Sequence, residues 1–219
     1  MNHEKPYRSE GGEQTDPTRP ETKPPIEPKI YVASLADYNN GHLHGAWIDA
    51  NQEADAIHRA TQAMLRSSPL AHRLYPPEEW AIHDYEGFHH FHLNEHTPVN
   101  IVAAIASGIA EHGVAFAHWA DELDDPSVDL LAQFEDHYLG EWNSLADYAE
   151  HHIAELGLKS RLEEATPEWL LNYTDIDYEQ IGNDLSHELI TSHDSASKTV
   201  HIFIVPDENP SEKPDEDQT

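Results

Sequence analysis

The chain has 219 residues, with 42 acidic against 12 basic side chains, and its formal net charge at pH 7 is −30. This charge disfavours binding to DNA, RNA or anionic membranes through the bulk surface, and it favours basic partners or dissolved cations. The absence of cysteine excludes disulfides, zinc–thiolate sites and cysteine nucleophiles. With 38% hydrophobic residues the chain can still bury a core, and its length allows one to three domains.

Both ends of the chain are polar. Residues 1–28 are rich in proline, glycine, threonine and glutamate, and 206–219 have the same character, so we expect a disordered leader and a disordered acidic tail. The start lacks the apolar core of a signal peptide, and no apolar run approaches the roughly 20 residues of a membrane span. We therefore expect a cytoplasmic protein whose ordered part lies between residues 29 and 205.

Residues 29–97 mix strand and helix patterns. Lys29–Leu35 ("KIYVASL") alternates β-forming residues and predicts a strand. Asn40-Gly41 is typical of a tight hairpin turn, which would lead into a second strand in "HLHGAWIDA". We expect a helix in "NQEADAIHRATQAMLRSSP", with Asn51 as its N-cap, and a third strand in "WAIHDYEG". These patterns predict an N-terminal α+β domain.

The hydrophobic pattern becomes helical from Thr97 onward. Thr97 can cap a helix that has proline at its first position and ends at Gly113. Two further helices are expected in "VAFAHWADEL" and "SVDLLAQFEDHYLG", the second capped by Ser127 and ended by Gly140. Residues 98–140 therefore form the predicted helical middle domain.

Residues 141–205 predict a second α+β domain. One helix is expected in "EWNSLADYAEHHIAELG", and another after Pro167 through "EWLLNYTDIDYEQIGNDLSHE", although Gly182 weakens it. "KTVHIFIV" predicts a strand whose partner is either a strand of the N-terminal domain or a local one around "ELITSH". Because −30 charges repel one another, we expect an elongated α+β protein with three small domains in a row.

The acidic residues are concentrated in the second half of the chain. From Glu111 to Asp194 there are 21 acids and two bases, a net charge of −19, whereas 29–110 carries nine acids and four bases, a net charge of −5. An acidic surface can simply improve solubility, but a uniform adaptation to salt does not predict this split. B-form DNA carries about two charges per base pair, so −19 matches about ten base pairs. Carboxylates, like phosphates, attract lysine and accept bidentate arginine.

We therefore predict an acidic surface that imitates DNA. Its residues are Glu111, Asp121, Glu122, Asp124, Asp125, Asp129, Glu135, Asp136, Glu141, Asp147, Glu150, Glu155, Glu163, Glu164, Glu168, Asp175, Asp177, Glu179, Asp184 and Glu188.

Aromatic residues recur at a spacing of four within this acidic region. Phe134, Tyr138 and Trp142 predict a helix whose aromatic side packs against the protein. The acidic residues between them, Glu135, Asp136 and Glu141, are expected to face solvent or the target.

Metal and enzyme chemistry are the main alternatives. His92, Glu95 and His96 form an H-x-x-E-H string, which on a helix would bind zinc. Gly87 and Pro98 bracket this string, so we expect a loop rather than a helix. Signatures of serine hydrolases, P-loops and dinucleotide sites are absent from the sequence. We assign no catalytic residue, no metal ligand and no cofactor, and expect a protein that is not an enzyme.

Several fragments together resemble a known family. They are "IYVASLADYNNGHLHGAWIDA" (30–50), "EEWAIHDYEGF" (78–88), "EHGVAFAHW" (111–119), "FEDHYLGEWNSLADYAEH" (134–151) and "YTDIDYEQIGNDL" (173–185). They are similar to the ArdA antirestriction proteins, and the resemblance covers about 29–205. The proline-rich leader and the acidic tail lie outside it.

The resemblance implies a function and a partner. ArdA proteins, encoded largely on mobile genetic elements, are elongated, mostly dimeric DNA mimics. They occupy the DNA-binding groove of type I restriction-modification enzymes, in the DNA-recognition and methyltransferase core, and they are not known as enzymes. Phe134, Tyr138, Gly140 and Trp142 match the family's antirestriction motif, for which we expect helix packing or a dimer contact. The alternative is a generic acidic module that binds other basic DNA-binding proteins.

Overall fold

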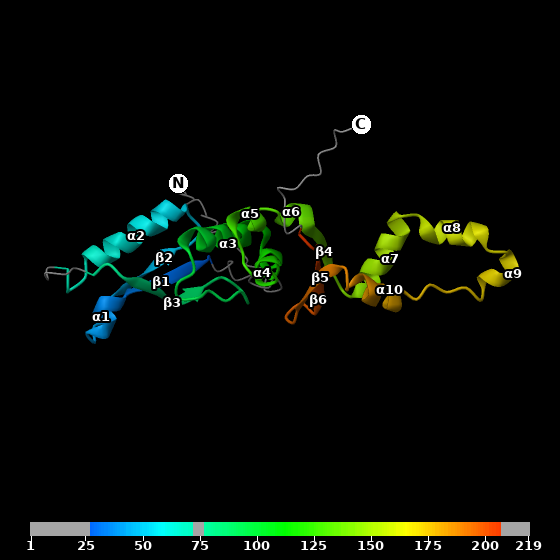
Figure 1. Ribbon diagram of the computed structural model, residues 1–219. Helices are drawn as coiled ribbons and strands as arrows, with labels where there is room; N and C mark the ends of the chain where they lie inside the picture. Colours follow the sequence, from blue (N-terminus) through cyan, green and yellow to red (C-terminus); the bar gives the residue numbers. More distant parts are fainter. Residues whose placement is uncertain (1–26, 72–76, 207–219) are drawn as a thin grey trace, which may run out of the picture.

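The computed structural model describes residues 27–71 and 77–206. The predicted leader and tail fall almost entirely outside these described residues. The fold is α+β, as predicted, with two antiparallel three-stranded sheets among the described residues. Figure 1 shows the elements in an extended row, from α1 and α2 at one end to α8 and α9 at the other.

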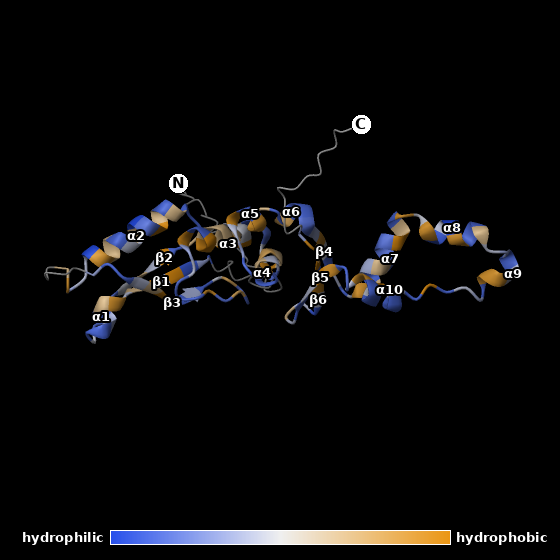
Figure 2. Cartoon of the chain, viewed as in Figure 1, coloured by the Kyte–Doolittle hydropathy of each residue, from blue (hydrophilic) through white to orange (hydrophobic). Residues whose placement is uncertain are grey.

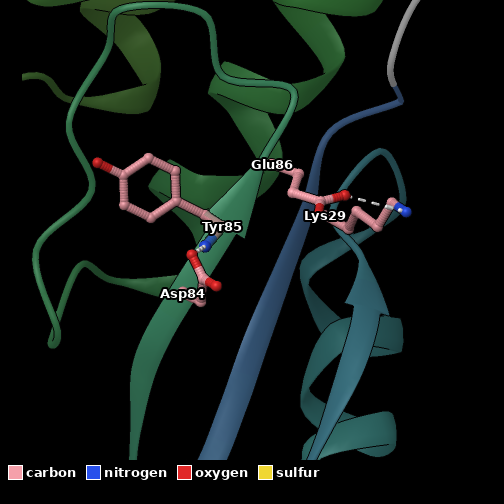
Figure 3. A network of polar contacts seen from close by, with 4 residues as sticks. All are labelled: Lys29, Asp84, Tyr85 and Glu86. Atoms are coloured by element: carbon pink, nitrogen blue, oxygen red, sulfur yellow. Dashed lines mark hydrogen bonds and ion pairs between the residues drawn. The ribbon is translucent and has the colours of Figure 1, made fainter.

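The first sheet has the strand order β2-β1-β3 and is built from the three predicted N-terminal strands. Its strands are β1 (Lys29–Ser34), β2 (Gly45–Asp49) and β3 (Trp80–Glu86). Lys29 lies opposite Glu86 in the ladder, and the Lys29 Nζ and Glu86 Oε2 atoms are 3.3 Å apart (Figure 3). The same figure shows the backbone N–H of Tyr85 donating to Asp84 Oδ1 at 2.8 Å. Of these two contacts, only the Lys29–Glu86 pair links β1 to β3, whereas the Tyr85–Asp84 hydrogen bond lies within β3.

The predicted tight hairpin between β1 and β2 is wrong, because a short helix, α1 (Leu35–Asn39), interrupts the connection. The Ser34 side chain caps it by accepting from the Asp37 N–H at 3.3 Å. Asp37 is buried and accepts a hydrogen bond from Ser68 Oγ at 2.7 Å. Since Ser34 offers the backbone a local cap, the chain turns into a helix before it reaches Asn40-Gly41.

Helices α2 (Ala54–Arg66) and α3 (Val99–His112) occur where they were predicted, but their predicted caps are wrong. The residues at the N-cap positions are Glu53 and Pro98, and neither makes a side-chain cap hydrogen bond. The Thr97 hydroxyl instead exchanges two hydrogen bonds with the backbone of Asn94, at 2.9 and 3.0 Å. A side chain that serves a neighbouring turn is not available to cap the helix.

The main core lies where α3 packs on α4 (Val114–Asp121) and continues under the first sheet. Gly113, with φ of 65°, separates the two helices. Gly108 of α3 permits the close approach, because a Cβ built there would lie 2.3 Å from the Phe116 ring. Trp119 is fully buried in this core.

The largest departure from the sequence prediction lies between residues 127 and 142. Ser127 does cap a helix, but that helix, α5 (Val128–Leu131), ends after one turn and is followed by α6 (Phe134–His137) and by a strand, β4 (Tyr138–Trp142). The predicted continuous helix is therefore wrong, and Tyr138, Gly140 and Trp142 lie on a strand. Aromatic residues favour strands, and the pairing partner that selects a strand here lies about 60 residues further along the chain.

The second sheet has the order β4-β6-β5, with β5 (Leu189–Asp194) and β6 (Thr199–Ile204) forming the hairpin predicted as one of two alternatives. Its central strand β6 pairs with β4 through a register shift between Tyr138 and Gly140. Gly140 adopts φ of 113°, which favours glycine. The predicted boundary at residue 140 thus falls inside a strand of this sheet.

Four helices form a projection that leaves the second sheet after β4 and returns at β5 (Figure 1). They are α7 (Leu145–Glu155), α8 (Leu158–Ala165), α9 (Glu168–Leu171) and α10 (Tyr178–Leu185). We call residues 143–188 the arm. The predicted single helix after Pro167 is wrong, because residues 172–177 separate α9 from α10. Helix α8 was not predicted.

Candidate functional site

The predicted acidic surface lies at the surface of the molecule. All twenty of its carboxylate residues are exposed. Within the described part of the chain, none of them forms an ion pair with a lysine or arginine; the pair of this kind that is present joins Lys29 and Glu86, in the first sheet. The charge of the acidic surface is therefore presented to solvent rather than neutralised internally.

The acidic surface consists of two groups of equal net charge. Nine of its acids lie between Glu111 and Glu141, on the end of α3, the end of α4 and the segments from there to β4, and that stretch contains no lysine or arginine. The other eleven lie on the arm together with Lys159 and Arg161, which gives −9 for each group. The acidity thus extends from the middle of the molecule to its far end (Figure 1).

Local structure separates the acidic side chains from the core in the first group. On α6, Phe134 is buried whereas Glu135 and Asp136 are exposed, as predicted. Glu141 is also exposed, but it lies on β4, where its Oε1 accepts a hydrogen bond from Thr199 Oγ1 at 2.6 Å. Strand alternation, rather than the predicted helical spacing, turns Glu141 outward.

The arm has almost no interior. Of residues 143–188 only Tyr148, Ala149 and Gly182 are buried. Helix α10 packs on α7 at Gly182, where an added Cβ would lie 2.6 Å from the backbone oxygen of Leu145. Figure 2 shows hydrophilic and hydrophobic residues interleaved along these helices. The arm therefore carries its carboxylates on helices that enclose little interior, so its surface is large for its volume.

The aromatic residues of the predicted motif belong to two different cores. Phe134 lies in the main core and stacks on Tyr138, with ring centroids 5.0 Å apart. Trp142 lies in a smaller core at the base of the arm, with its centroid 5.5 Å from that of Tyr148. Gly140 lies at the register shift of β4, between Tyr138 and Trp142. A Cβ built at Gly140 would lie 3.2 Å from Trp142 Nε1. The motif therefore fixes the join between the second sheet and the arm.

Tyr138 is held as a neutral phenol within this motif. Burial, and secondly the nearby charge of Glu141, raise the pKa of Tyr138 to about 12. Its hydroxyl lies 3.0 Å from His201 Nδ1. Such a group acts as a hydrogen-bonding and packing element at neutral pH rather than as a nucleophile.

The H-x-x-E-H string lies in a loop, as predicted. His92, Glu95 and His96 are all exposed and none belongs to a helix. Their arrangement does not reproduce the helical face on which this motif binds zinc.

Two features were not found by reading the sequence. Apolar residues are exposed at the end of the arm, where the side chains of Trp169 and Tyr173 are 71% and 82% exposed. Near them, Leu162, Leu171 and Ile176 line a pocket of about 250 Å³. The second feature is a group of buried histidines around His118, between α4 and the second sheet. The histidine group has no local signal, because His118 and His201 are distant in the sequence and only the fold brings them together.

Within the described residues, no helix has both the length and the hydropathy that crossing a membrane requires.

One of two comparisons with known proteins agrees with the fragments that carry the resemblance. A search of curated proteins finds no match. The family model described as "Antirestriction protein (ArdA)" matches residues 30–195, which is more than half of the chain and includes the first sheet apart from Lys29, the arm and every residue of the acidic surface. The chain belongs to the ArdA antirestriction protein family.

Proposed function

We propose that this protein blocks restriction by acting as a DNA mimic. Its acidic surface would occupy the DNA-binding groove of type I restriction-modification enzymes, in their DNA-recognition and methyltransferase core. The observation that carries the proposal is the set of twenty exposed carboxylates without a lysine or arginine partner in the described structure. Membership of the antirestriction family supports the same function.

Electrostatic attraction supplies the driving force. A groove that binds DNA is lined with lysine and arginine placed for phosphates, and carboxylates accept hydrogen bonds from both in the same way. The net charge of −19 between Glu111 and Asp194 equals that of about ten base pairs, close to one turn of B-form DNA. A homodimer joined end to end would extend the imitation to about two turns.

The fold favours a prearranged mimic. The first nine acids lie on or beside the main core, so little conformational entropy is lost when they bind. The extended row of elements in Figure 1 presents charge along a length rather than over a sphere. In our proposal three units make up this row, an N-terminal α+β unit, a helical middle and a C-terminal unit with the arm. A mimic of phosphates reads no bases, so it would inhibit enzymes that recognise different sequences.

The proposal is tested by competition for a purified type I methyltransferase. A fluorescent DNA duplex containing the recognition site is bound to the enzyme, and this protein is then titrated into the complex. We expect complete displacement of the duplex, and the methylation rate measured in the same mixture shows whether modification is blocked along with restriction. In cells, unmodified phage should plate more efficiently on a restricting host that expresses the protein.

A histone-like or nucleoid protein serves as the control partner. If the acidic protein bound the control partner tightly but failed to displace DNA from the methyltransferase, that result would contradict the proposal and favour a generic acidic module. Displacement of DNA from both partners with equal affinity would show that charge alone, rather than its arrangement, determines binding.

A further inference from the structure

Two buried histidines and a carboxylate meet between α4 and the second sheet. They are His118 of α4, His201 of β6 and Asp194 at the end of β5. Their candidate ligand atoms all lie within 4.8 Å of one another. His118 is 4% exposed and His201 is 1% exposed, whereas Asp194 is half-buried and leaves the group a route to solvent.

The register of the second sheet explains why these residues meet. Ser192 lies directly opposite His201 in the β5–β6 ladder, and Asp194 follows Ser192 by two residues on the same face of β5. The imidazole Nδ1 of His118 lies 2.9 Å from Ser192 Oγ, which places His118 over that face. The hairpin and α4 therefore bring the three side chains together from three separate elements.

The hydrogen bonds of the two histidines leave one nitrogen free on each ring. His118 Nδ1 pairs with Ser192 Oγ, and His201 Nδ1 lies 3.0 Å from the Tyr138 hydroxyl. The Nε2 atoms of both rings are buried and have no hydrogen-bond partner among the described residues. Metal-binding histidines use this arrangement, in which one ring nitrogen donates to an outer partner and the other coordinates the ion.

We propose that His118, His201 and Asp194 form a binding site for a divalent transition-metal ion, with Zn²⁺ as the best fit. Two imidazoles and a carboxylate suit zinc, whereas Mg²⁺ and Ca²⁺ prefer oxygen ligands throughout. A solvent molecule would complete a tetrahedral site on the side of Asp194. The sequence assigned no metal ligand to this chain, so the proposal departs from that expectation and is independent of the proposed DNA mimicry.

The protonation states of the three groups fit coordination at neutral pH. Burial, together with the neighbouring rings of His90 and His201, lowers the pKa of His118 to about 4. Burial also lowers the pKa of His201. The backbone N–H of Ala196 is the main cause that lowers the pKa of Asp194. Metals bind neutral imidazole and ionised carboxylate, so no ligand has to lose a proton first.

Coordination requires short distances between the ligand atoms. Zinc lies about 2.0–2.2 Å from nitrogen and oxygen ligands, which places neighbouring tetrahedral ligand atoms roughly 3.3–3.5 Å apart. The present separations are at most 4.8 Å, and we expect small side-chain rotations to complete the coordination geometry. Binding would then tie α4 to the hairpin that carries one end of the arm.

The test uses the full chain without a histidine tag, treated with EDTA and dialysed before titration with ZnCl₂. Because the chain has 18 histidines, weak surface binding is expected in every variant. We expect one tight site per chain in the wild type, selective for Zn²⁺ over Mg²⁺. The double variant His118→Gln/His201→Gln should bind Zn²⁺ at that site at least about 100-fold more weakly.

His193→Gln is the matched control, because His193 is exposed on the same strand as Asp194. It should keep the tight site with an affinity within about twofold of the wild type. Equal weakening by His193→Gln, or a wild type that binds no more tightly than the double variant, would overturn the proposal.

A second readout remains decisive if the double variant does not fold. Asp194→Asn conserves the shape of a half-buried side chain, and circular dichroism checks its fold. Co²⁺ bound to the wild type should show the intense visible absorption of tetrahedral coordination, and Asp194→Asn should weaken or remove it. A wild-type spectrum typical of six-coordinate Co²⁺, the same as that of free ions, would exclude the site.

Discussion

The helices of the arm and those of the main core differ in how much of their side-chain surface is buried. In the main core, Trp119 is completely buried and α3 and α4 approach closely at Gly108. In the arm, Trp169 is 71% exposed and only three residues between 143 and 188 are buried. A surface that presents many carboxylates needs a high ratio of surface to volume, and the arm achieves this ratio by giving up a core of its own.

Because the arm has almost no core of its own, its helices must be stabilised by contacts at its base. Isolated helices shorter than about 12–15 residues are marginal in water, and α8 and α10 have only eight residues each. The arm depends on its base, where Trp142, Tyr148 and Leu145 pack against β6 and where Gly182 lets α10 lie on α7. We therefore propose that Phe134, Tyr138, Gly140 and Trp142, the predicted antirestriction motif, form the structural base of a charged projection.

The role of the arm is tested most sharply by neutralising equal numbers of exposed acids in the arm and in the N-terminal region. The arm variant changes four glutamates to glutamine, and so does the N-terminal variant; the positions are Glu150, Glu163, Glu164 and Glu168, against Glu53, Glu78, Glu79 and Glu95. If each lost ion pair contributes roughly 0.5 kcal/mol, the arm variant should bind a type I methyltransferase about 30-fold more weakly.

The N-terminal variant should bind within a few-fold of the wild type, because its acids lie outside the acidic surface. Competition with a DNA duplex measures both variants in the same assay. Equal losses in the two variants would mean that total charge matters and that the arm has no special role.

Removing the two tryptophans compares burial directly. Trp119→Ala should lower the free energy of unfolding by about 3–5 kcal/mol, because it deletes a fully buried side chain and leaves a cavity. Trp169→Ala should change that free energy by less than about 0.5 kcal/mol. Urea unfolding followed by circular dichroism gives both values. A large loss from Trp169→Ala would show that the end of the arm is covered in solution, for example by a second protomer.

Two helical glycines test the packing of each region. Gly108→Ala places a methyl group against the Phe116 ring, and Gly182→Ala places one against the Leu145 backbone. Each should cost about 1–3 kcal/mol of packing free energy. Gly108→Ala should lower the urea midpoint of the whole molecule. Gly182→Ala should instead raise hydrogen exchange in α7 and α10 alone, and unchanged exchange there would contradict the proposed base of the arm.

The smallest expected effect is a pH dependence confined to the N-terminal region. Burial alone would raise the pKa of Asp37, but the Ser34 and Ser68 hydroxyls beside its carboxylate outweigh this effect and lower the pKa below its usual value. A carboxyl group with a lowered folded-state pKa stabilises the protein above its unfolded pKa of about 3.9, and this stability is lost as the pH falls through the folded value.

Asp37→Asn should therefore be less stable than the wild type near neutral pH, and the difference should shrink below about pH 4. Urea midpoints measured across this range give the difference directly. A difference that stays constant with pH would show that the charge of Asp37 makes no contribution.

Local sequence patterns predicted much of the fold and the exposure of the twenty carboxylate residues. Alternation predicted β1 and β3, and the apolar run after Pro98 predicted α3. Exposure of the acids followed from their positions between apolar residues at regular spacing, since a charged side chain is rarely buried without a partner.

The remaining features depend on contacts that are distant in the sequence. Tyr138–Trp142 fits a helical spacing and becomes a strand only because β6 is available as its partner. Thr97 does not cap α3, because its hydroxyl instead bonds to the backbone of the turn at Asn94. The group of His118, Asp194 and His201 has no spacing motif, because α4 and a β-hairpin contribute its members. Non-local pairing of this kind leaves no periodic signal in a single sequence.

The most direct test of fixed carboxylates as phosphate mimics is the salt dependence of binding to a type I methyltransferase. Affinity should fall by at least about 100-fold between roughly 50 and 200 mM salt, since screening and counterion release act on every charge contact. The variant with four neutralised arm glutamates should show a shallower dependence on salt. A wild-type affinity that stays constant over this range would contradict electrostatic mimicry of DNA.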